Sequence, residues 1–484
     1  MSAAGPRRSG VESAPAPAHR RRLARAADRR ARDLGPRLMV PLCAGAVLNP
    51  VNSTMIATAL APIGREFAVG AGATAWLVSV MYVASAVGQP VAGRLADQFG
   101  PRRVFLAGGL LVAVAGLIGA LAPTFGWLVA ARVVVGLGTG AAYPAAVAMV
   151  REQADRLGVP TPARALGLLN TASLVTLTVG PPLGGVLVDT VGWRAVFAIN
   201  APLGLLVTAL GLRYLPRSRP RARTLPAWRV LDLPGVALFG GAVVLLMLVL
   251  TTLPAPPWPV VLGLAGCLLA LVLTELRSRS PFLDVRMLAG NPPLVVTYLR
   301  VVLTFLVVYG VLFGVTPWLQ EGRGLSASAA GFVLLGMSAV GTVASLFAVR
   351  GPRPFWPLFV PALGLLAGSL SLTVLDAGTP VAVLACVAAV FGLPNGMGQV
   401  ANQVMVYRAA PAEQVGAATG LSRTAQYTGA MIATSLTGLA YAHGVDDAGL
   451  HVLGWAFTAV GAVLVTVTLA DRSLRRPLDP GAPR

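Results

Sequence analysis

Long apolar runs dominate the sequence and limit the possible folds more than any other feature. Fourteen such runs follow one another after residue 37, most of them near the ~20 residues that a helix needs to cross a bilayer. Charged residues make up only 12% of the 484 residues, against about 25% in soluble domains. This composition excludes a soluble enzyme, a nucleic-acid-binding domain and a disulfide scaffold. We therefore predict an all-α membrane protein with fourteen transmembrane helices, near 38–62, 73–92, 103–122, 126–149, 165–188, 195–214, 234–253, 257–275, 293–316, 328–349, 356–375, 380–405, 416–440 and 450–470.

The basic residues predict how the chain is oriented. The net charge is +20, and every basic residue is an arginine. Arginines concentrate in every second joint between spans, whereas the remaining joints hold only Arg65, Arg194 and Arg323. Cytoplasmic loops of membrane proteins collect positive charge. We therefore expect a multi-pass plasma (inner) membrane protein with both termini in the cytoplasm, and no nucleic-acid partner.

Composition along the chain predicts two six-helix bundles with an inserted two-helix hairpin. A basic loop without a long apolar run follows the sixth span, and the next two spans are apolar with few polar residues. The basic N-terminal segment is expected to be a disordered cytoplasmic tail, although binding to anionic lipid headgroups is the alternative. The predicted boundaries are 1–36 for this tail, 37–214 for the N-terminal bundle, 215–233 for the cytoplasmic loop, 234–275 for the hairpin, 276–470 for the C-terminal bundle and 471–484 for a cytoplasmic tail.

The joint between the second and third spans carries a conspicuous motif, GRLADQFGPRR. Its glycines Gly93 and Gly100 permit a very tight turn. Asp97 can pair with an arginine or meet a helix N-terminus, where the helix dipole favours an anion. The simpler interpretation is a short loop whose Arg102 and Arg103 only set topology. The segment resembles the loop signature of the major facilitator superfamily, from which it departs at Gln98.

The fourth span holds Arg132 and the glycines Gly136, Gly138 and Gly140. A charge at membrane depth costs at least ~2.5–3.5 kcal/mol, so it usually faces a cavity or a partner. The alternative is that Arg132 lies near the end of the span and extends toward water. The glycines allow close helix contact. This stretch is similar to the family's fourth-span motif, which implies a role for Arg132 in proton coupling.

The fifth span ends in GPPLGG, which contains Gly180, Pro181, Gly184 and Gly185. Proline and glycine together bend a helix and let another backbone approach. The segment resembles the motif of antiporters in the superfamily, and residues 192–204 resemble the opening of the sixth span in drug:proton antiporters. The resemblance implies the fourteen-span branch: a secondary transporter that exports small organic compounds such as drugs or antibiotics by alternating access. It would use the proton gradient and no cofactor.

One departure from the branch concerns the first span, where Asn52 stands in place of the usual aspartate. No Asp or Glu occupies the middle of any predicted span. A proton carrier needs a group whose pKa can cross the working range. Asp97 is therefore the first candidate for carrying the proton, and Asp189 is the second.

The charges expected deep in the membrane are Arg132, Arg300 and Arg423. Arginine does not titrate at cellular pH, so these cations favour a cavity for anionic or polar neutral compounds. The competing interpretation gives Arg300 and Arg423 structural roles. Polar residues in hydrocarbon must find partners, either in a cavity or on another helix. The residues predicted to line the cavity are Asn52, Arg300, Asn395, Gln399, Arg423 and Tyr427.

Other functions stay open at this level. A uniporter, or a transporter of an anionic or polar metabolite coupled to another ion, would need no proton carrier. A non-transporting sensor or a lipid-handling scaffold is a further alternative. A membrane enzyme is not expected, because the predicted outer joints are short.

Cys43, Cys267 and Cys386 lie apart in apolar runs, so neither a disulfide nor a metal site is expected. The predicted partners are a small organic substrate, protons and membrane lipid, and we expect a monomer.

Overall fold

The computed structural model of the chain describes residues 35–157, 163–217, 232–278, 285–348, 354–410 and 415–475. Residues 1–34 of the predicted tail, most of the basic loop 215–233 and residues 476–484 lie outside the described residues. Every regular element in the described part is helical, as predicted. The main helices are α2 (Pro36–Glu66), α3 (Ala71–Phe99), α4 (Pro101–Ala120), α5 (Phe125–Leu157), α6 (Ala163–Thr190), α7 (Arg194–Ala198), α8 (Asn200–Tyr214), α10 (Leu233–Thr251), α11 (Trp258–Arg277), α12 (Val285–Ala289), α13 (Pro292–Gly310), α14 (Ala327–Ser345), α15 (Phe355–Leu372), α16 (Val381–Val390), α17 (Gln399–Ala409), α18 (Val415–Ala440) and α19 (Asp447–Ala470).

Three π-helical segments and a 3-10 turn complete the described chain. The segments η1 (Val311–Val315) and η2 (Trp318–Gly322) extend α13, and η3 (Pro394–Gly398) joins α16 to α17. The turn η5 (Arg472–Arg475) follows α19. Single π-helical turns inside α-helices are frequent at functional sites. The backbone thus departs from regular α-helical geometry in the α13 span and in the α16–α17 span.

Twelve helices in the described residues are long and apolar enough to cross a membrane. The helices α6 and α18, which cover two further predicted spans, have 28 and 26 residues but are not among those twelve. Several helices begin where the sequence supplies a cap, since Asn291, Ser326 and Asp446 each accept a hydrogen bond from a backbone N–H in the first turn. Such capping satisfies donors that an α-helix leaves free at its start. The polar joints therefore place the helix boundaries.

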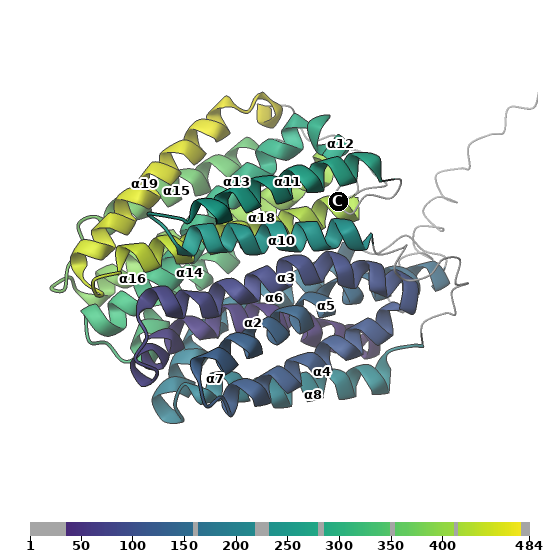
Figure 1. The fold of residues 1–484 in the computed structure, drawn as a ribbon, viewed down its shortest axis with the longest axis horizontal. Coiled ribbons are helices and arrows are strands. Elements are labelled where there is room, and N and C mark those ends of the chain that lie inside the picture. Colours follow the sequence, from purple (N-terminus) through teal and green to yellow (C-terminus); the bar gives the residue numbers. More distant parts are fainter. Residues whose placement is uncertain are drawn as a thin grey trace, which may run out of the picture.

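The helices form two groups that lie side by side (Figure 1). The N-terminal half comprises α2 to α8, and the C-terminal half comprises α13 to α19. Between them α10 and α11 pack against each other, and α10 also contacts α3 and α18. Only Leu271 and Glu275 are buried on α11. This pair of helices therefore lies on the periphery of the molecule.

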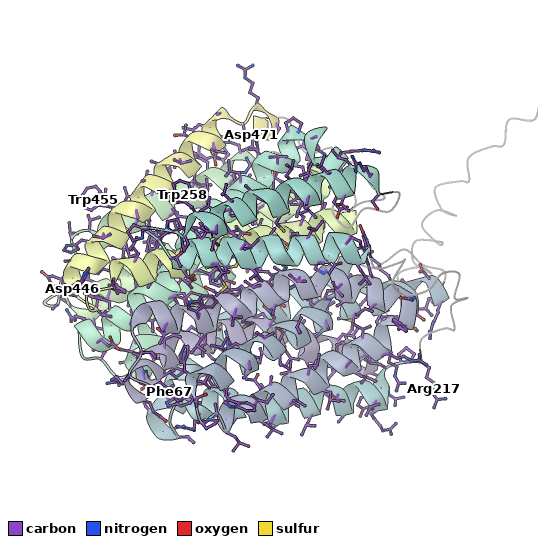
Figure 2. All side chains as sticks on the ribbon, in the orientation of Figure 1. Phe67, Arg217, Trp258, Asp446, Trp455 and Asp471 are labelled. Atoms are coloured by element: carbon purple, nitrogen blue, oxygen red, sulfur yellow. The ribbon has the colours of Figure 1, made fainter. Side chains whose placement is uncertain are left out.

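Apolar side chains cover much of the outer surface. Trp258, Leu262 and Leu121 are 76%, 68% and 79% exposed, and many other large apolar residues are exposed on the outer helices. Trp258 and Trp455 lie on this surface in Figure 2. Large exposed apolar areas mark protein or membrane contact. With twelve apolar helices of spanning length among its described residues, the protein requires lipid around this surface.

Consecutive long helices run in opposite directions, so the molecule has two ends. We call the end where α2 begins and α19 stops the terminal end, and the opposite end the distal end. Figure 2 shows Arg217 on the terminal side, and Phe67 and Asp446 on the distal side. Glu66 at the end of α2 accepts hydrogen bonds from Trp193 and Arg194 near the start of α7, at 2.5 and 2.6 Å. This cluster joins helices of the N-terminal half at the distal end.

The predicted close helix contact of the fourth-span glycines is confirmed at Gly136 and Gly138, whereas Gly140 makes only ordinary contacts. A Cβ atom on Gly136 would lie 2.5 Å from the Met81 carbonyl oxygen of α3, and one on Gly138 would lie 2.8 Å from the Gly108 carbonyl oxygen of α4. Real Cβ atoms do not approach other atoms this closely. The absence of side chains at these two positions is therefore what lets α5 pack directly on α3 and α4.

Candidate functional site

Arg132 lies on α5 and is 2% exposed. Its Nε donates to the Leu77 carbonyl oxygen of α3 at 2.7 Å, and Nη1 donates to the Asn52 carbonyl oxygen of α2 at 3.1 Å. Nη2 has no hydrogen-bond partner in the described part of the chain. Arg132 therefore ties three helices together through backbone oxygens and does not extend to the end of its helix. This agrees with the prediction that a charged side chain at membrane depth faces a cavity or a partner.

Asn52 is buried and bonds within the N-terminal half. Its Nδ2 donates to Asn200 Oδ1 of α8 at 2.6 Å and to the Leu48 carbonyl oxygen at 3.0 Å. The residue is 5% exposed. The sequence predicted that Asn52 lines a cavity, whereas the structure gives its amide a partner on a neighbouring helix. We therefore leave it out of the residues proposed to contact substrate.

Arg300 lies on α13 toward the terminal end and forms an ion pair. Its Nη1 lies 2.7 Å from Asp471 Oδ2, with side chains 1% and 8% exposed. Its Nη2 donates to Thr297 Oγ1 at 3.1 Å. Burial acts to raise the pKa of Asp471, but hydrogen bonds from Ser473 and Arg300 outweigh it and leave that pKa below its usual range. The structure thus places Arg300 in a structural pair and apart from the central polar residues, which corrects its expected place in the cavity.

A row of side chains joins α3 to α18, one helix from each half. We call it the polar seam. The hydroxyls of Ser79 and Thr434 lie 2.6 Å apart, and Gln89 Nε2 donates to the Tyr427 hydroxyl at 2.5 Å. The rings of Tyr82 and Tyr427 are stacked with centroids 5.3 Å apart. Tyr427 was predicted for the cavity, and the structure places it where the two halves meet.

The aromatic rings continue from the polar seam onto α13. Tyr82 lies 5.3 Å from Tyr309 between ring centroids, and Tyr309 is stacked on Phe313 of η1 at 5.8 Å. The Tyr82 hydroxyl is buried and has no hydrogen-bond partner among the described residues. Sequence reasoning missed Tyr82 and Tyr309. Their only signal is an aromatic residue in the middle of a span, which many packing residues share.

Arg423 of α18 lies near the polar seam on its terminal side. Its Nη1 donates to Gln426 Oε1 at 3.2 Å, and the guanidinium lies 5.2 Å from the ring centroid of Tyr143 on α5. Unlike Arg132 and Arg300, it remains partly exposed. Arg423 is thus a cation from the C-terminal half that contacts the N-terminal half.

The predicted cavity residues of the twelfth span lie on η3 and α17. Asn395 is 6% exposed and belongs to the π-helical segment. A Cβ atom on Gly392 would overlap the Met337 carbonyl oxygen of α14, which shows how closely these helices pack. The side-chain oxygens Gln399 Oε1 and Asn402 Oδ1 are buried without hydrogen-bond partners in the described ranges. Buried polar atoms of this kind require an explanation such as water or a ligand.

A second seam joins α6 of the N-terminal half to α14 of the C-terminal half. We call it the glycine seam. A Cβ atom on Gly331 would lie 2.5 Å from the Pro181 carbonyl oxygen. A Cβ atom on Gly185 would meet the backbone of Ala327, and one on Gly184 would lie 2.7 Å from the Met55 carbonyl oxygen of α2. The predicted approach of another backbone to the GPPLGG segment is confirmed, and it involves both α2 and α14.

Asp189 closes the glycine seam at the distal end. Its carboxylate accepts hydrogen bonds from the backbone N–H groups of Ala327 at 3.2 Å and Ser328 at 2.8 Å, and from the Ser328 hydroxyl. These groups form the start of α14, where the helix dipole favours an anion. An aspartate of one half therefore caps a helix of the other half. The sequence placed Asp189 at the end of a span but gave no sign of this partner.

The GRLADQFGPRR motif turns at Gly100 as predicted, whereas Gly93 lies within α3 and takes no part in the turn. Gly100 has φ +91° and separates α3 from α4, which begins at Pro101. Such a φ strains any residue that carries a Cβ atom. Arg102 Nη2 donates to the Leu212 carbonyl oxygen at 3.0 Å, and Arg103 is exposed. The side chain of Asp97 lies outside the described residues.

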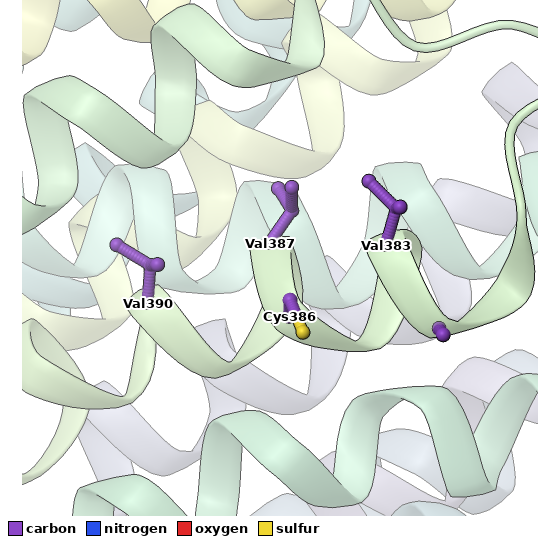
Figure 3. Close-up of a pocket in the computed structure, with 5 residues that line it drawn as sticks. Val383, Cys386, Val387 and Val390 are labelled. Carbon is purple, nitrogen blue, oxygen red and sulfur yellow. The ribbon is translucent and has the colours of Figure 1, made fainter.

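A shallow apolar groove lies away from these residues on α16. It is lined by Ala382, Val383, Cys386, Val387 and Val390 (Figure 3). Val383 is 44% exposed, and the groove offers no charged or hydrogen-bonding side chain except the thiol. It lies on the outer apolar surface and does not contribute to the candidate site.

Family comparison shows what kind of protein carries this arrangement. The family model described as Major Facilitator Superfamily matches residues 42–434. The chain belongs to the Major Facilitator Superfamily. Members of this superfamily are transporters and not enzymes, and they are generally driven by ion gradients without a cofactor.

Relatives of this superfamily member include export proteins. The uncharacterized MFS-type transporter YwoD of Bacillus subtilis (strain 168) is 31% identical over 444 residues, which cover 90% of this chain and 97% of YwoD. The tetracenomycin C resistance and export protein of Streptomyces glaucescens is 30% identical over 420 residues, covering 84% of this chain and 76% of that protein. Homologues of this transporter thus include a protein of antibiotic resistance and export.

A solved structure shares the fold. The inward open conformation of the xylose transporter XylE from E. coli superimposes with a TM-score of 0.61 and 16% sequence identity, over 92% of this chain and 97% of XylE. At this identity the likeness concerns the fold alone. It confirms the major facilitator fold that the motifs led us to expect.

Proposed function

We propose that the protein exports small organic compounds such as drugs or antibiotics across the plasma membrane by alternating access, in exchange for protons. The observation that carries this proposal is the meeting of Tyr82, Tyr427 and Arg423 where the two halves contact each other, in a member of this superfamily. Transporters of this type hold substrate at the interface between repeats near mid-membrane. The tetracenomycin C export protein supports export as the direction.

The proposed membrane arrangement has fourteen spans, with α6 and α18 added to the twelve apolar helices and α10–α11 as the inserted hairpin. The arginine-rich terminal end would face the cytoplasm, because positive loops are retained there. The basic tail would meet anionic lipid headgroups, and the protein would act as a monomer. Fusions of a periplasmic reporter to both termini test the orientation, and activity of the reporter at either terminus contradicts it.

In the state that we propose for this structure, the distal end is closed. Asp189 caps α14 from the other half, and Gln320 Nε2 of η2 donates to the Thr58 carbonyl oxygen of α2 at 3.2 Å. Substrate would then enter from the terminal end and contact Asn395, Gln399, Arg423 and Tyr427. The bend at Gly180, Pro181, Gly184 and Gly185 would hold α6 close to α2 and α14 while the halves rock.

The proposed conformational elements lie in the signature loop and on α5. Asp97, with Gly93, Gly100, Arg102 and Arg103, would switch the terminal end between its two arrangements. Arg132 would link this movement to α2 and α3 through its bonds to their carbonyl oxygens. Asp97 is our first candidate for the group that carries the proton.

Transport by purified protein in proteoliposomes with an imposed pH gradient tests the proposal. We expect uptake of antibiotics and dyes that depends on the gradient and is lost in Asp97→Asn and Arg132→Ala. Asp376→Asn is the matched control, because that carboxylate accepts hydrogen bonds within its own loop, from Gly378 and Thr379. Transport that ignores the gradient would instead support a uniporter, which Asn52 in place of an acid favours. Absence of transport with retained ligand binding would support a sensor.

A further inference from the structure

Arg132, Arg300 and Arg423, the arginines expected deep in the membrane, differ in how their charge is balanced. Arg132 bonds two backbone carbonyl oxygens, and Arg300 is paired with Asp471. Arg423 lies among the tyrosines Tyr143, Tyr309 and Tyr427, and its Nη1 donates to Gln426 Oε1 at 3.2 Å. In the described part of the chain, no carboxylate forms an ion pair with Arg423. The charge of Arg423 is therefore not balanced by any acidic side chain of the described residues.

The position of Arg423 fits a ligand contact better than a packing role. It is partly exposed, and it lies over the Tyr143 ring of the opposite half at 5.2 Å. Arginine can pack over an aromatic face and still offer a planar fork of N–H donors that matches a carboxylate. Such a group binds carboxylate or phenolate oxygens by charge-assisted hydrogen bonds. This cation between the halves is thus available to an anion that enters there.

The neighbouring rings define the rest of the ligand. Tyr82, Tyr427, Tyr309 and Phe313 form a continuous series of ring contacts with centroid separations of 5.3 to 5.8 Å. Aromatic faces favour offset or edge-to-face contact with other rings. The described carboxylates lie near helix ends or in joints, so none of them offers a counter-ion beside these rings for a cationic drug.

We propose that Arg423 binds the acidic group of the substrate, so that the site prefers planar aromatic compounds with a carboxylate or an acidic phenol over cationic aromatic compounds. This inference rests on the proposed function, because it takes the junction of the halves as the substrate site. The rings of Tyr82, Tyr309 and Tyr427 supply the aromatic contact, and Tyr143 holds the guanidinium in place.

The test compares two dyes with the same ring system and opposite charge. Fluorescein is an anionic xanthene and rhodamine 6G is a cationic one. Fluorescence anisotropy with the full-length protein in detergent measures both affinities. We expect fluorescein to bind at least about tenfold more tightly, and Arg423→Gln to remove that preference, since a charged hydrogen bond is worth about tenfold or more in affinity. Arg423→Lys should retain part of it.

A matched control uses another arginine that lies over a tyrosine. Arg213 is exposed and its guanidinium lies 5.5 Å from the Tyr214 ring, so Arg213→Gln removes the same chemical group from the surface. It should leave both affinities unchanged. Size-exclusion profiles that match the wild type exclude a folding defect in each variant. Tyr143→Phe is a second variant that keeps the ring under the guanidinium, and it should keep the preference for fluorescein.

The inference is overturned if rhodamine 6G binds as tightly as fluorescein, if neither dye binds, or if Arg423→Gln leaves the ratio of the two affinities unchanged. Failure of the proposed function gives a different result. In that case fluorescein binds through Arg423, but proteoliposomes move neither dye under a pH gradient. If both dyes are transported and Arg423→Gln does not change the ratio of their affinities, this inference is wrong and the proposed function stands.

Discussion

The polar seam and the glycine seam join the same two halves by different means. Along α3 and α18 the contacts are made by side chains, in the pairs Ser79–Thr434 and Gln89–Tyr427. Along α6 and α14 the backbones themselves meet, because Gly331 has no Cβ atom. Side-chain hydrogen bonds can be exchanged for water or ligand at little net cost, whereas a close backbone contact tolerates no added atom. We therefore expect the polar seam to open to a substrate and the glycine seam to hold the halves in register.

The largest effect should come from filling the glycine seam. Gly331→Leu adds a side chain where a Cβ atom would already lie 2.5 Å from the Pro181 carbonyl oxygen, and overpacking of this kind costs about 3 kcal/mol. We expect a strongly lowered Tm and loss of transport. Gly266→Leu is the control, because a Cβ atom on Gly266 of α11 would have no other atom within 4 Å. Equal Tm values for the two variants would contradict the close backbone contact.

The next largest effect should come from Asp189→Asn. This change replaces one of the two carboxylate oxygens that accept hydrogen bonds from the start of α14. We expect the closed distal end to lose about 1–2 kcal/mol. The measurement is the labelling rate of Thr58→Cys, in a background without the native cysteines, by a maleimide that does not cross membranes. Thr58 is fully buried in α2 near Gln320, so we expect about tenfold faster labelling. The control Asp376→Asn should leave the rate unchanged, and a rate that responds equally to both variants would contradict the cap.

A smaller effect is expected in the polar seam at its central hydrogen bond. Tyr427→Phe and Gln89→Leu each remove one partner of the 2.5 Å contact. In a double-mutant cycle on thermal stability, the two changes should show a coupling energy of about 1 kcal/mol. Additive effects would mean that this contact does not hold the halves together.

The smallest effect is expected from Ser79→Ala. The Thr434 hydroxyl keeps a second bond, to the Met431 carbonyl oxygen at 2.9 Å, so its proton stays satisfied when Ser79 loses its oxygen. We expect a loss of under about 0.5 kcal/mol, since no donor is left unpaired. A shift in Tm as large as that of Gly331→Leu would mean that the two seams do not differ in this way.

Local features of the site could be predicted, but their long-range partners could not. The tight turn at Gly100 and the close approach of Gly184 and Gly185 follow from residue types whose physical effect is local. The cap that Asp189 forms on α14 links residues 138 and 139 positions apart. The ion pair between Arg300 and Asp471 also joins residues far apart in the chain. The sequence predicted a cavity role for Arg300 because it did not show that Asp471 lies beside it. An acid directly after the last span was a usable signal for that pair.

The helical membrane fold and the tight turns between its helices follow from the amino-acid sequence alone. Apolar run length, arginine placement and glycine act within one or two helices, so their effect can be read along the chain. Three contacts became known only from the packing of the helices: Asn52 bonds Asn200, Tyr82 stacks on Tyr427, and Arg423 lies beside Tyr143 without a carboxylate among the described residues. These contacts join helices that are far apart in the chain. Periodicity within a helix does not record which side chains meet across such distances, because that depends on how the helices and the two halves pack together.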